Sequence, residues 1–427
     1  MMRAVSSMSM LRAFAGLGLL SVGLSGCTTT TTARAGSAAQ QAHAIPPTQA
    51  TKVTGSGAAA PAISITPADR AGGVPLDTSI SVTSRGGTLS SVTVTSGDRP
   101  IGQGGVLNKG HDQWIQSGGL DSDMTYAVRA VATATNGSST TALTSFHTLA
   151  AQKLTSDTSP GDGEDVGVGM PVKIHFNTDI PNDKRQGIID HIAVKSAPPQ
   201  NGGWYWPAAN ELHYRPQHYW ISGSSVSVQA LLQGVDAGNR FWGLDNWTLA
   251  FHIADKHVAI IDTAAHNMKV YNNDRLVDTW PVSTGRPNRQ TINGKLVIWG
   301  KTSKIRMDSR TLGIPIGSPD GYLEDVYWDT AISTDGFYVH SAPWSVWAQG
   351  SSNVSHGCVN LSPDHAITFY NTSIPGDVVE VINSDRPASF DDGEGDWQTD
   401  FSQLAQGGHA VNGAGGSAPS QAPIRTS

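Results

Sequence analysis

The stretch Tyr126-Ala-Val-Arg-Ala-Val-Ala132 alternates apolar and polar side chains. Thr78-Ser-Ile-Ser-Val-Thr83 and Ser91-Val-Thr-Val-Thr95 show the same period of two. Successive side chains of a β-strand point to opposite faces, so each stretch predicts a strand with one buried face and one wet face. Gly-Gly, Ser-Gly-Asp and Asn-Gly sequences supply the reversals of an antiparallel sheet.

The composition favours a folded, β-rich chain of several domains. Its 427 residues predict two or three domains. Hydrophobic residues make up 38%, enough for packed cores, while 47 glycines and 23 prolines favour turns and short strands. Lys and Arg number 28 against 35 Asp and Glu, a net charge of −7. Without a basic surplus to neutralise phosphates, nucleic acid is excluded as an expected partner.

The N-terminus has the pattern of an export signal. Arg3 and Arg12 flank the start of an apolar run that ends at Leu24, and this run is shorter than the ~18–20 residues that span a bilayer. Leu24-Ser-Gly-Cys27 resembles a bacterial lipobox. We therefore predict a lipoprotein signal peptide over 1–26 and lipidation of Cys27, which would anchor the chain to the extracytoplasmic face of the cell membrane. An ordinary secretory signal with an unrelated cysteine is the alternative.

Low-complexity sequence lies at both ends of the mature chain. Residues 27–61 are rich in Thr, Ala, Ser, Gln and Pro, and residues 407–427 in Gly, Ser, Ala and Pro, so we predict a flexible linker and a flexible tail. The two cysteines, Cys27 and Cys358, stand in very different contexts, so we do not expect a disulfide. Cys358 is then the only free thiol of the mature protein.

Two tandem β-sandwiches are expected between the linker and the chemistry-bearing part of the chain. Residues 62–149 and 150–254 repeat the same pattern of short strands, which resembles immunoglobulin domains. Trp114 and Tyr126 are the expected centres of the first core. The second unit carries five tryptophans, which we interpret as core or interface, with a glycan-stacking platform as the alternative: Trp204, Trp206, Trp220, Trp242 and Trp247.

The third unit, 255–383, is predicted to be β-rich with one short helix. Its strands are expected within 258–262, 267–271, 275–282 and 296–299, and another within 377–382. Ser362-Pro-Asp-His has a helix N-cap, a proline at the first helical position and an acidic first turn, which predicts a helix over 362–370. Residues 384–406 are expected to form an extension that packs on this unit through Phe390, Trp397 and Phe401.

The reactive group that the residues suggest is the thiol of Cys358. It lies in Ser355-His-Gly-Cys-Val-Asn360, downstream of the strand-like Tyr338-Val-His340. A free thiol has a pKa of about 8.5, so it benefits from a base, and histidine can accept and return its proton. His340 and His356 are both candidates; we prefer His340 as base because a neighbouring strand can present it to the thiol. The alternatives are an inert buried cysteine and a zinc site of His340, His356 and Cys358.

The same residues resemble a known family. His340-Ser341, an intervening loop and Ser355-His-Gly-Cys-Val-Asn360 are similar to the signature of bacterial L,D-transpeptidases, which are cysteine acyltransferases that crosslink peptidoglycan. The order of lipobox, two immunoglobulin-like units and this unit resembles the mycobacterial and related actinobacterial members. The resemblance implies a mainly β fold: two immunoglobulin-like sandwiches and a β-rich catalytic domain with a short helix after the cysteine.

The resemblance also implies roles for individual residues. Cys358 would be the nucleophile and His340 the base, oriented by the Ser341 backbone, with the N–H groups of Gly357 and Cys358 as oxyanion donors. The segment from Ile305 through Tyr322 would be a mobile lid. Residues expected to bind substrate are Met307, Tyr322, Asp335, Gly336, Ser355, His356 and Asn360. Trp344 is expected to be a structural wall, and neither a metal nor another cofactor is expected.

The implied function is the formation of 3→3 peptidoglycan crosslinks. A tetrapeptide stem would lose its terminal D-Ala to form a thioester on Cys358, and the side-chain amine of a diaminopimelate on another stem would accept the acyl group. Carbapenem β-lactams are expected as covalent inhibitors. Two alternatives stay open: an L,D-carboxypeptidase, with water as the acceptor, and a catalytically inactive lipoprotein that binds the cell wall through its sandwiches.

Overall fold

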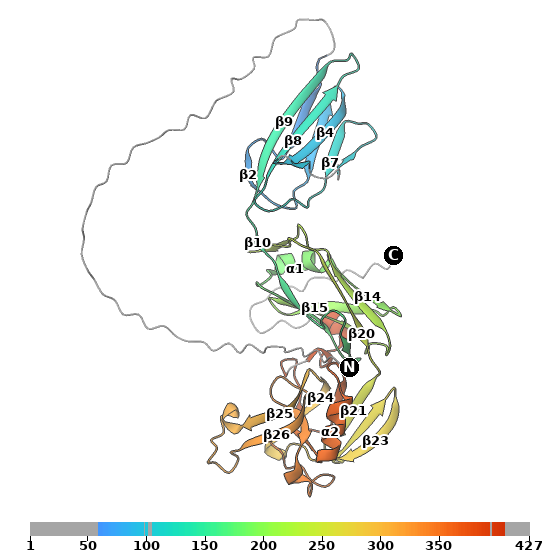
Figure 1. Cartoon of the computed structure of the whole chain (residues 1–427), viewed down its shortest axis with the longest axis vertical. Coiled ribbons are helices and arrows are strands. Elements are labelled where there is room, and N and C mark those ends of the chain that lie inside the picture. The colour runs from blue at the N-terminus through green and yellow to red at the C-terminus, as the bar shows by residue number, and fades with distance from the viewer. Residues whose placement is uncertain (1–58, 98, 101–104, 393–394, 406–427) are drawn as a thin grey trace, which may run out of the picture. The chain divides into compact units, whose positions relative to one another are not determined.

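The computed structural model describes residues 59–97, 99–100, 105–392 and 395–405. Strands dominate the fold, as predicted, and helices are few (Figure 1). The predicted signal peptide, Cys27, nearly all of the 27–61 linker and the 407–427 tail lie outside the described residues. Within the described part of the chain, no helix is both long and apolar enough to cross a membrane.

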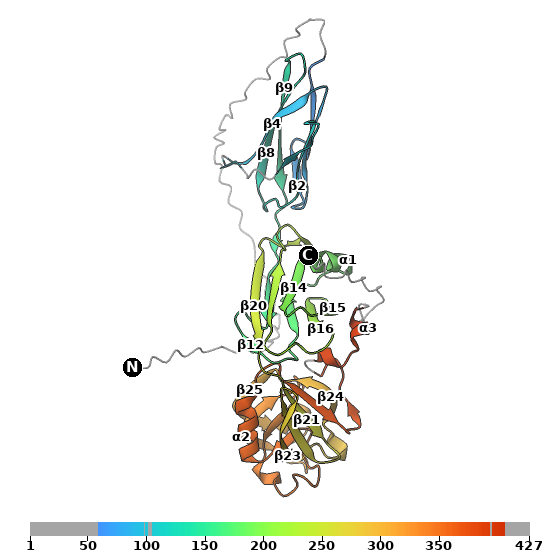
Figure 2. The ribbon, with the colours of Figure 1, turned by 90° about the vertical axis from the view of Figure 1, so that its right-hand side faces the viewer.

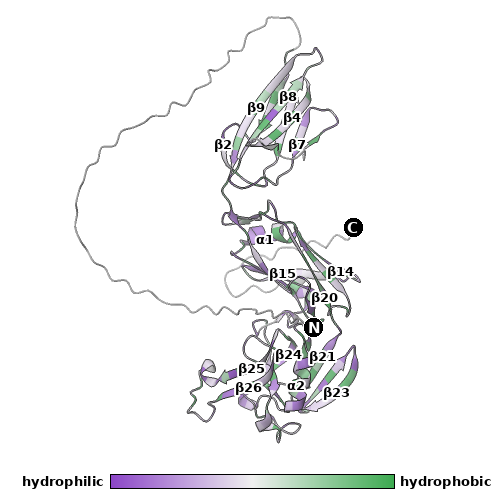
Figure 3. Ribbon diagram, viewed as in Figure 1, coloured by the Kyte–Doolittle hydropathy of each residue, from purple (hydrophilic) through white to green (hydrophobic). Residues whose placement is uncertain are grey.

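The first unit is a β-sandwich. Its two sheets have strand orders β1-β3-β7-β6 and β2-β9-β8-β4-β5. Exposed and buried residues alternate along β8, and Figure 3 shows hydrophilic and hydrophobic residues mixed along the strands. The buried Tyr126 stacks on Phe146 with ring centroids 5.3 Å apart, whereas Trp114 is only partly buried. The strands are β1 (Ala62–Thr66), β2 (Ala71–Val74), β3 (Ile80–Arg85), β4 (Thr88–Ser96), β5 (Arg99–Pro100), β6 (Val106–Leu107), β7 (Gln113–Gln116), β8 (Thr125–Thr133) and β9 (Ser139–Thr148).

The second unit is also a sandwich, with a small extra sheet. Its strand orders are β11-β13-β16-β15 and β12-β20-β17-β14, with β10-β19-β18 beside them. A helix that we did not predict, α1 (Asn182–Ile189), is anchored by the buried Ile188 and Ile189. The strands are β10 (Gln152–Lys153), β11 (Ser156–Ser159), β12 (Asp165–Val166), β13 (Val172–Phe176), β14 (Ile192–Ala197), β15 (Gly202–Ala208), β16 (Glu211–Pro216), β17 (Ser225–Ala230), β18 (Asp236–Gly238), β19 (Phe241–Trp242) and β20 (Trp247–Ile253).

The tryptophans of the second unit belong to its interior. Trp204, Trp206, Trp220 and Trp242 are buried, and Trp247 packs against the core from its edge. The indole N–H of Trp220 donates to the Met170 carbonyl at 2.7 Å, which satisfies its buried polar atom. These side chains therefore stabilise the sandwich, and the glycan-platform alternative has no exposed ring there to support it.

The third unit consists of two sheets and a helix. Their strand orders are β23-β22-β21-β29-β24-β30 and β25-β26-β27-β28. The hydrophobic core cluster combines residues of both sheets with Ala366 and Phe369 of α2 (Pro363–Thr372). The strands are β21 (His257–Asp262), β22 (Asn267–Asn272), β23 (Arg275–Pro281), β24 (Ile292–Val297), β25 (Gly300–Asp308), β26 (Leu323–Ala331), β27 (Tyr338–Ser341), β28 (Val359–Leu361), β29 (Val378–Ile382) and β30 (Arg386–Pro387).

The helix after the cysteine begins where its sequence predicts. The Ser362 hydroxyl accepts from the His365 N–H at 3.4 Å, Pro363 is the first helical residue, and Asp364 lies in the first turn. A proline tolerates this position because its missing N–H would have no partner there. The helix start follows directly after β28, so it holds the end of the segment that carries Cys358.

The extension after β29 packs on two units. Through β30 it pairs with β24, and the Gln398 side chain donates to the Lys295 carbonyl of the same strand. Its aromatic side chains, however, lie on the second sandwich rather than on the third unit, where we expected them. Figure 2 shows α3 (Phe401–Ala405) beside β15 and β16. Phe390 contacts Tyr205, Trp397 contacts Tyr219, and Arg215 lies over the rings of Trp397 and Phe401.

Glycine permits a close backbone approach between the second sandwich and the third unit. The Gly167 N–H donates to the Pro375 carbonyl and the Gly169 N–H to the Gly376 carbonyl, both at 2.8 Å. A Cβ at Gly167 would lie 2.1 Å from the Asp377 nitrogen, so no larger residue fits. Val378 of β29 also joins the core of the second sandwich. The two units therefore share packing and are not merely joined by a linker.

A buried charge cluster fastens the extension to the second sandwich. The His213 ring bonds Asp396 at 2.8 Å and Glu211 at 2.9 Å, and Arg215 donates to the carbonyls of Asp396 and Thr399. Burial opposes the imidazolium, but the two carboxylates outweigh it and raise the pKa of His213 to about 9. Burial likewise opposes ionised Asp396, but His213 holds its pKa down to about 2. The pair is charged throughout the neutral range.

Replacing Asp396 with alanine is expected to lower the free energy of unfolding by about 3 to 5 kcal/mol at about pH 6, since it leaves the buried imidazolium of His213 with only the partly exposed Glu211 as a partner. Because the pKa of His213 is raised, the contribution of the pair is complete below about pH 6.5 and declines as the pH rises through about 9. Urea unfolding at about pH 6 and pH 10 should therefore show a smaller difference from wild type at the higher pH.

Asp165→Ala is the matched control, because Asp165 and His252 form an exposed pair at 3.9 Å. Its effect should stay within about 0.5 kcal/mol at either pH. Equal losses in the two variants would contradict the role given to the buried cluster.

Candidate active site

The pairing of β27 with β28 brings the predicted nucleophile and base to one face of a sheet. The strands are parallel, with Val339 opposite Val359 and His340 opposite Asn360. Opposed residues of a parallel pair share a face, and every second residue returns to it. Cys358, the residue before β28, therefore lies on the face that carries His340. Both side chains line the same cavity.

The imidazole of His340 is held in one tautomer. The ring is 3% exposed, and its Nδ1 lies 3.0 Å from the Ser341 carbonyl oxygen. A carbonyl can only accept, so Nδ1 carries the proton and Nε2 keeps its lone pair. The Ser341 backbone thus has the orienting position that the family resemblance implies.

The loop around Cys358 is braced by hydrogen bonds on both sides. The Ser355 hydroxyl donates to the Cys358 carbonyl at 2.6 Å and accepts from the Gly357 N–H at 3.1 Å. Thr291 donates to the Gly357 carbonyl at 2.6 Å. Gly357 has φ +133°, and a Cβ there would lie 2.9 Å from the Phe337 ring. Only glycine suits this position, and the Gly357 N–H that we expected to bind an oxyanion is used inside the loop.

A cavity of about 270 Å³ opens above this pair. Most of the residues predicted from the sequence line it, namely Met307, Tyr322, His340, Ser355, His356, Cys358 and Asn360. Of its other lining residues, Trp344 was expected as a wall, and Pro319, Asp320 and Gly321 belong to the predicted lid. Glu324, Val326 and Val354 were not predicted. The Asn360 amide donates to the Ser345 hydroxyl at 3.0 Å, which holds it in place.

Two predicted substrate-binding residues do not line this cavity. The Gly336 carbonyl lies 3.7 Å from the Cys358 sulfur, so it contacts the thiol from outside the cavity wall. Asp335 is exposed and lies next to Asp392 of the extension; desolvation and that neighbouring carboxyl raise its pKa. Asp335 belongs to the loop between β26 and β27, where it meets the extension, a contact that no local sequence pattern could indicate.

The predicted lid is the tip of a hairpin. β25 and β26 extend from the body of the unit in Figure 1, and residues 309–322 connect them. Asp320 of this tip forms a salt bridge with Arg286 at 2.7 Å, and the Tyr322 ring lies 4.9 Å from the His356 ring. These contacts close the hairpin over the cavity and join it to the cysteine loop.

The thiol and the imidazole are both neutral near pH 7. Burial raises the pKa of Cys358 to about 12, although a hydrogen bond from the Tyr338 backbone opposes the shift. Burial also lowers the pKa of His340 to about 4. A pre-formed thiolate–imidazolium pair is therefore disfavoured, and the geometry suits a base that removes the proton as the sulfur attacks.

Sequence reasoning missed a buried carboxyl near this pair. Asp329 of β26 is fully buried, and neither of its oxygens has a hydrogen-bond partner. It lies where β26 bulges opposite β27, between the pairs Tyr327–Ser341 and Thr330–Val339. Burial raises the pKa of Asp329 to about 7, and its charge acts on Cys358 and Tyr338. The only feature of the sequence that could have indicated this buried carboxyl is an acidic residue within the run Val326-Tyr-Trp-Asp-Thr330.

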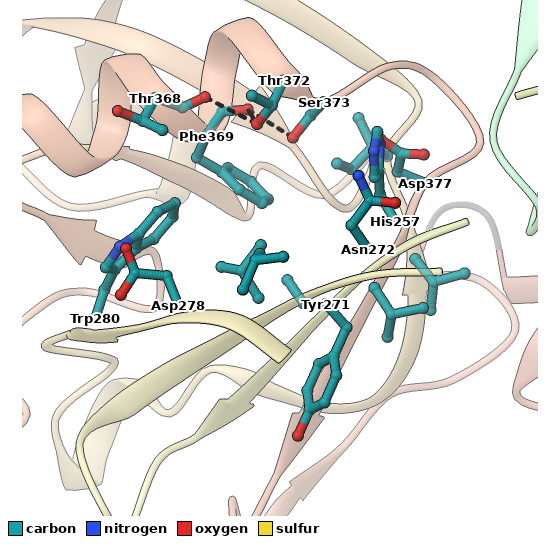
Figure 4. A pocket seen from close by; sticks show the side chains of 16 residues that line it. His257, Tyr271, Asn272, Asp278, Trp280, Thr368, Phe369, Thr372, Ser373 and Asp377 are labelled. Carbon is teal, nitrogen blue, oxygen red and sulfur yellow. Dashed lines mark hydrogen bonds and ion pairs between the residues drawn. The ribbon is translucent and has the colours of Figure 1, made fainter. Parts of the chain in front are cut away.

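A second cavity, of about 250 Å³, lies between β21, β22, β23 and α2 (Figure 4). His257 and Asp377 lie together at one end of the view, with their side chains 3.3 Å apart, and Asp278 and Trp280 lie at the other. None of its lining residues is a cysteine or belongs to the first cavity. The hydroxyls of Thr368, Thr372 and Ser373 in its lining donate to backbone carbonyls of α2 and not to His257. The candidate active site is therefore the cavity at Cys358.

No group of three or more His, Cys, Asp or Glu side chains among the described residues is arranged to hold a metal ion. The zinc alternative for His340, His356 and Cys358 consequently has no structural support in that part of the chain.

Comparisons with known proteins find an Ig-like region and an L,D-transpeptidase catalytic domain in this chain. Residues 71–236 match the bacterial Ig domain, and residues 256–381 match the L,D-transpeptidase catalytic domain. L,D-transpeptidase 2 of Mycobacterium tuberculosis is 39% identical over 311 residues, which are 72% of this chain and 75% of that protein. L,D-transpeptidase 1 of the same species is 36% identical over 224 residues, 52% of this chain and 83% of the relative.

Solved structures of related proteins cover about half of this chain. A structure of LD transpeptidase LdtMt1 in complex with imipenem is 35% identical, with a TM-score of 0.47, and spans 53% of this chain and 97% of the other. L,D-transpeptidase 3 of M. tuberculosis, in complex with a faropenem-derived adduct, is 30% identical, with a TM-score of 0.46 and coverage of 53% and 97%.

The neutral state of the thiol predicts an unusual alkylation profile. Because the pKa of Cys358 is raised to about 12, its reaction with iodoacetamide should keep accelerating up to about pH 10, whereas an ordinary thiol with pKa about 8.5 levels off above about pH 9. Mass spectrometry of the peptide that contains Cys358 measures the rate, with glutathione as the ordinary thiol. A plateau below pH 9 would show that the thiolate forms readily.

Asp329→Asn is expected to stabilise the protein at about pH 8, by about 2 to 4 kcal/mol, and to have little effect near pH 4. A buried acid whose pKa is raised binds its proton more tightly in the folded state, so stability falls as the pH rises from about 4 to 7. Chemical unfolding at both pH values checks the sign. The exposed Asp157→Asn is the control and should change neither value by more than about 0.5 kcal/mol.

Proposed function

Because this chain belongs to the L,D-transpeptidase family, we propose that it forms 3→3 crosslinks in peptidoglycan through a thioester on Cys358. The donor would be a tetrapeptide stem and the acceptor the side-chain amine of a diaminopimelate residue on a second stem. The observation that carries the proposal is the placement of Cys358 and the Nε2 lone pair of His340 on one sheet face, at one cavity.

The first step transfers the acyl group of the donor to sulfur. As the S–C bond forms at the carbonyl of the third stem residue, the thiol proton passes to His340 Nε2. The imidazolium then protonates the nitrogen of the terminal D-Ala, whose departure breaks the amide bond and leaves a thioester. The neutral starting pair requires that proton removal accompany attack, and the fixed tautomer of His340 provides the acceptor.

The second step transfers the acyl group to the acceptor amine. The amine nitrogen attacks the thioester, His340 takes one of its protons, and the C–S bond breaks to give the new amide. The proton returns to sulfur and regenerates the thiol. Water would compete at this stage, so the closed β25–β26 hairpin, held by Arg286 and Asp320, has a physical purpose.

The cavity is also suited to covalent inhibition by β-lactams. The relatives with solved structures were captured with imipenem and with a faropenem-derived adduct. A strained lactam carbonyl presents the same electrophile to Cys358 as the donor stem, so we propose that carbapenems acylate this chain at the same sulfur. The tandem sandwiches would then serve as a spacer that carries the catalytic unit away from the membrane.

Incubation of the purified protein with tetrapeptide-stem muropeptides, followed by mass analysis of the products, tests the proposal. Dimeric stems with loss of D-Ala are expected, and Cys358→Ala should give none while its thermal unfolding stays close to that of wild type. Tripeptide monomers as the sole product would instead establish an L,D-carboxypeptidase. Unchanged substrate with a folded wild-type protein would leave a wall-binding role.

We further propose that Cys27 anchors the protein to the cell membrane through a lipid. The motif Leu24-Ser-Gly-Cys27 supports this, as does the polar linker that follows. Cys27→Ala should move most of the protein from the membrane fraction to the soluble fraction of its host, because the unlipidated protein lacks the acyl chains that would hold it in the bilayer. Cys358→Ala, with its lipobox intact, is the matched control. Equal membrane retention of both variants would contradict lipid anchoring.

A further inference from the structure

Two exposed indole rings lie in the segment that leads to Cys358, and one of them, Trp344, lines the cavity at that residue. Trp344 is 48% exposed and lines the cavity beside His340, and Trp347 is 74% exposed, the most of the chain's tryptophans. Both belong to the connection between β27 and β28, the same segment that ends at Cys358. The exposed Val346 lies between them in the sequence. Exposed apolar side chains that lie next to a cavity-lining residue are a typical feature of ligand-contact surfaces.

The Trp347 ring is positioned rather than loose. Its Nε1 donates to the Trp344 carbonyl at 3.1 Å. The backbone beneath is a tight turn: Ser345 and Ala348 are buried, and the Ala348 N–H donates to the Ser345 carbonyl at 2.9 Å. Because most of this large aromatic side chain is left in water, it contributes little to packing within this chain.

The segment that carries the two rings is polar but uncharged. No Asp, Glu, Lys, Arg or His occurs from Ser341 to Ser355. The turn continues into Ser351, Ser352 and Asn353, which line a separate cavity of about 520 Å³ whose walls are mainly hydroxyl and amide groups, together with His266 and Asp385. This segment therefore joins the Cys358 cavity to a surface rich in neutral hydrogen-bonding groups.

These features fit a sugar better than a membrane. A pyranose ring offers a C–H face that packs on an indole, and its hydroxyl and acetamido groups hydrogen-bond to neutral amides and hydroxyls. Binding to an anionic bilayer relies on lysine and arginine beside the aromatic side chains, and this segment has neither. The net charge of the chain is also negative.

We propose that Trp347, with Trp344, binds an N-acetylated sugar ring of the glycan strand that carries the donor stem. The inference rests on the proposed function for the identity of the polymer and extends it to a saccharide subsite outside the peptide cavity. The stem would enter past Trp344 toward Cys358 while its sugar packs on Trp347. Stems on intact glycan would then be preferred over free stem peptides.

Binding is tested with the full chain and a soluble β-linked N-acetylhexosamine tetramer, followed by tryptophan fluorescence and calorimetry. Loss of one aromatic packing partner should weaken binding about 5- to 10-fold in Trp347→Ala. Trp299→Ala is the matched control, because Trp299 is 43% exposed and lines neither cavity. Its affinity should equal that of wild type. Equal affinities in all three proteins, or no binding to wild type, would overturn the proposal.

Kinetics separate this inference from the proposed function. For crosslinking, the ratio of kcat/KM on glycan-attached stems to kcat/KM on free tetrapeptide should fall about 5-fold in Trp347→Ala and remain unchanged in Trp299→Ala. If wild type crosslinks neither substrate, the proposed function fails, and the sugar titration still decides the subsite. If wild type crosslinks and the ratio is unchanged in Trp347→Ala, the subsite fails alone.

A vesicle experiment tests whether the exposed indoles bind a lipid membrane instead of a sugar. Cosedimentation with phosphatidylglycerol vesicles is expected to be the same for wild type, Trp347→Ala and Trp299→Ala when the lipidated residue is replaced in all three. Loss of vesicle binding in Trp347→Ala alone would assign the exposed indoles to a membrane and overturn the sugar subsite.

Discussion

The parallel pairing of β27 with β28 is the constraint on which the rest of the site depends. It sets Val339 against Val359, and the alternation of the strands then puts His340 and Cys358 on one face. The pairing is reinforced from the other side, where Ser283 bridges to Asn360 and Thr291 bonds the Gly357 carbonyl. A slip of one residue in this register would turn the thiol away from the cavity.

Burial then determines the chemical state of the pair. Burial favours the uncharged forms of both groups, although the thiol of Cys358 stays partly exposed, so a resting thiolate–imidazolium pair is disfavoured. The nearby Asp329 carboxyl is buried, and neither of its oxygens has a hydrogen-bond partner. This carboxyl therefore destabilises the sheet that carries the site.

The second sandwich is part of the support of the catalytic unit and not only a spacer. Gly167 and Gly376 bring the two backbones into contact, and Val378 lies in the core of the sandwich. The extension adds the buried His213–Asp396 pair and the aromatic rings around Arg215. These contacts lie beside β29 and β24, whose sheet packs against the sheet that carries His340 and Cys358. The geometry at Cys358 therefore depends on residues more than one hundred positions away.

Period-two patterning, the helix cap at Ser362 and the Ser-His-Gly-Cys motif were sufficient to predict two sandwiches, a β-rich third unit, its helix and the candidate pair, since these signals are local. The sequence could not predict the bounds of single strands or the helix α1. Nor could it predict that Phe390, Trp397 and Phe401 pack on the second sandwich, because such contacts depend on partners distant in sequence. Only the tertiary structure decided which predicted residues meet. Met307 and Tyr322 line the cavity, whereas Asp335 does not. The Gly357 N–H donates within its own loop, and Trp347 is exposed to water. The physical reason is that side-chain burial and hydrogen-bond partners follow from how strands pair and pack, which no short stretch of sequence specifies.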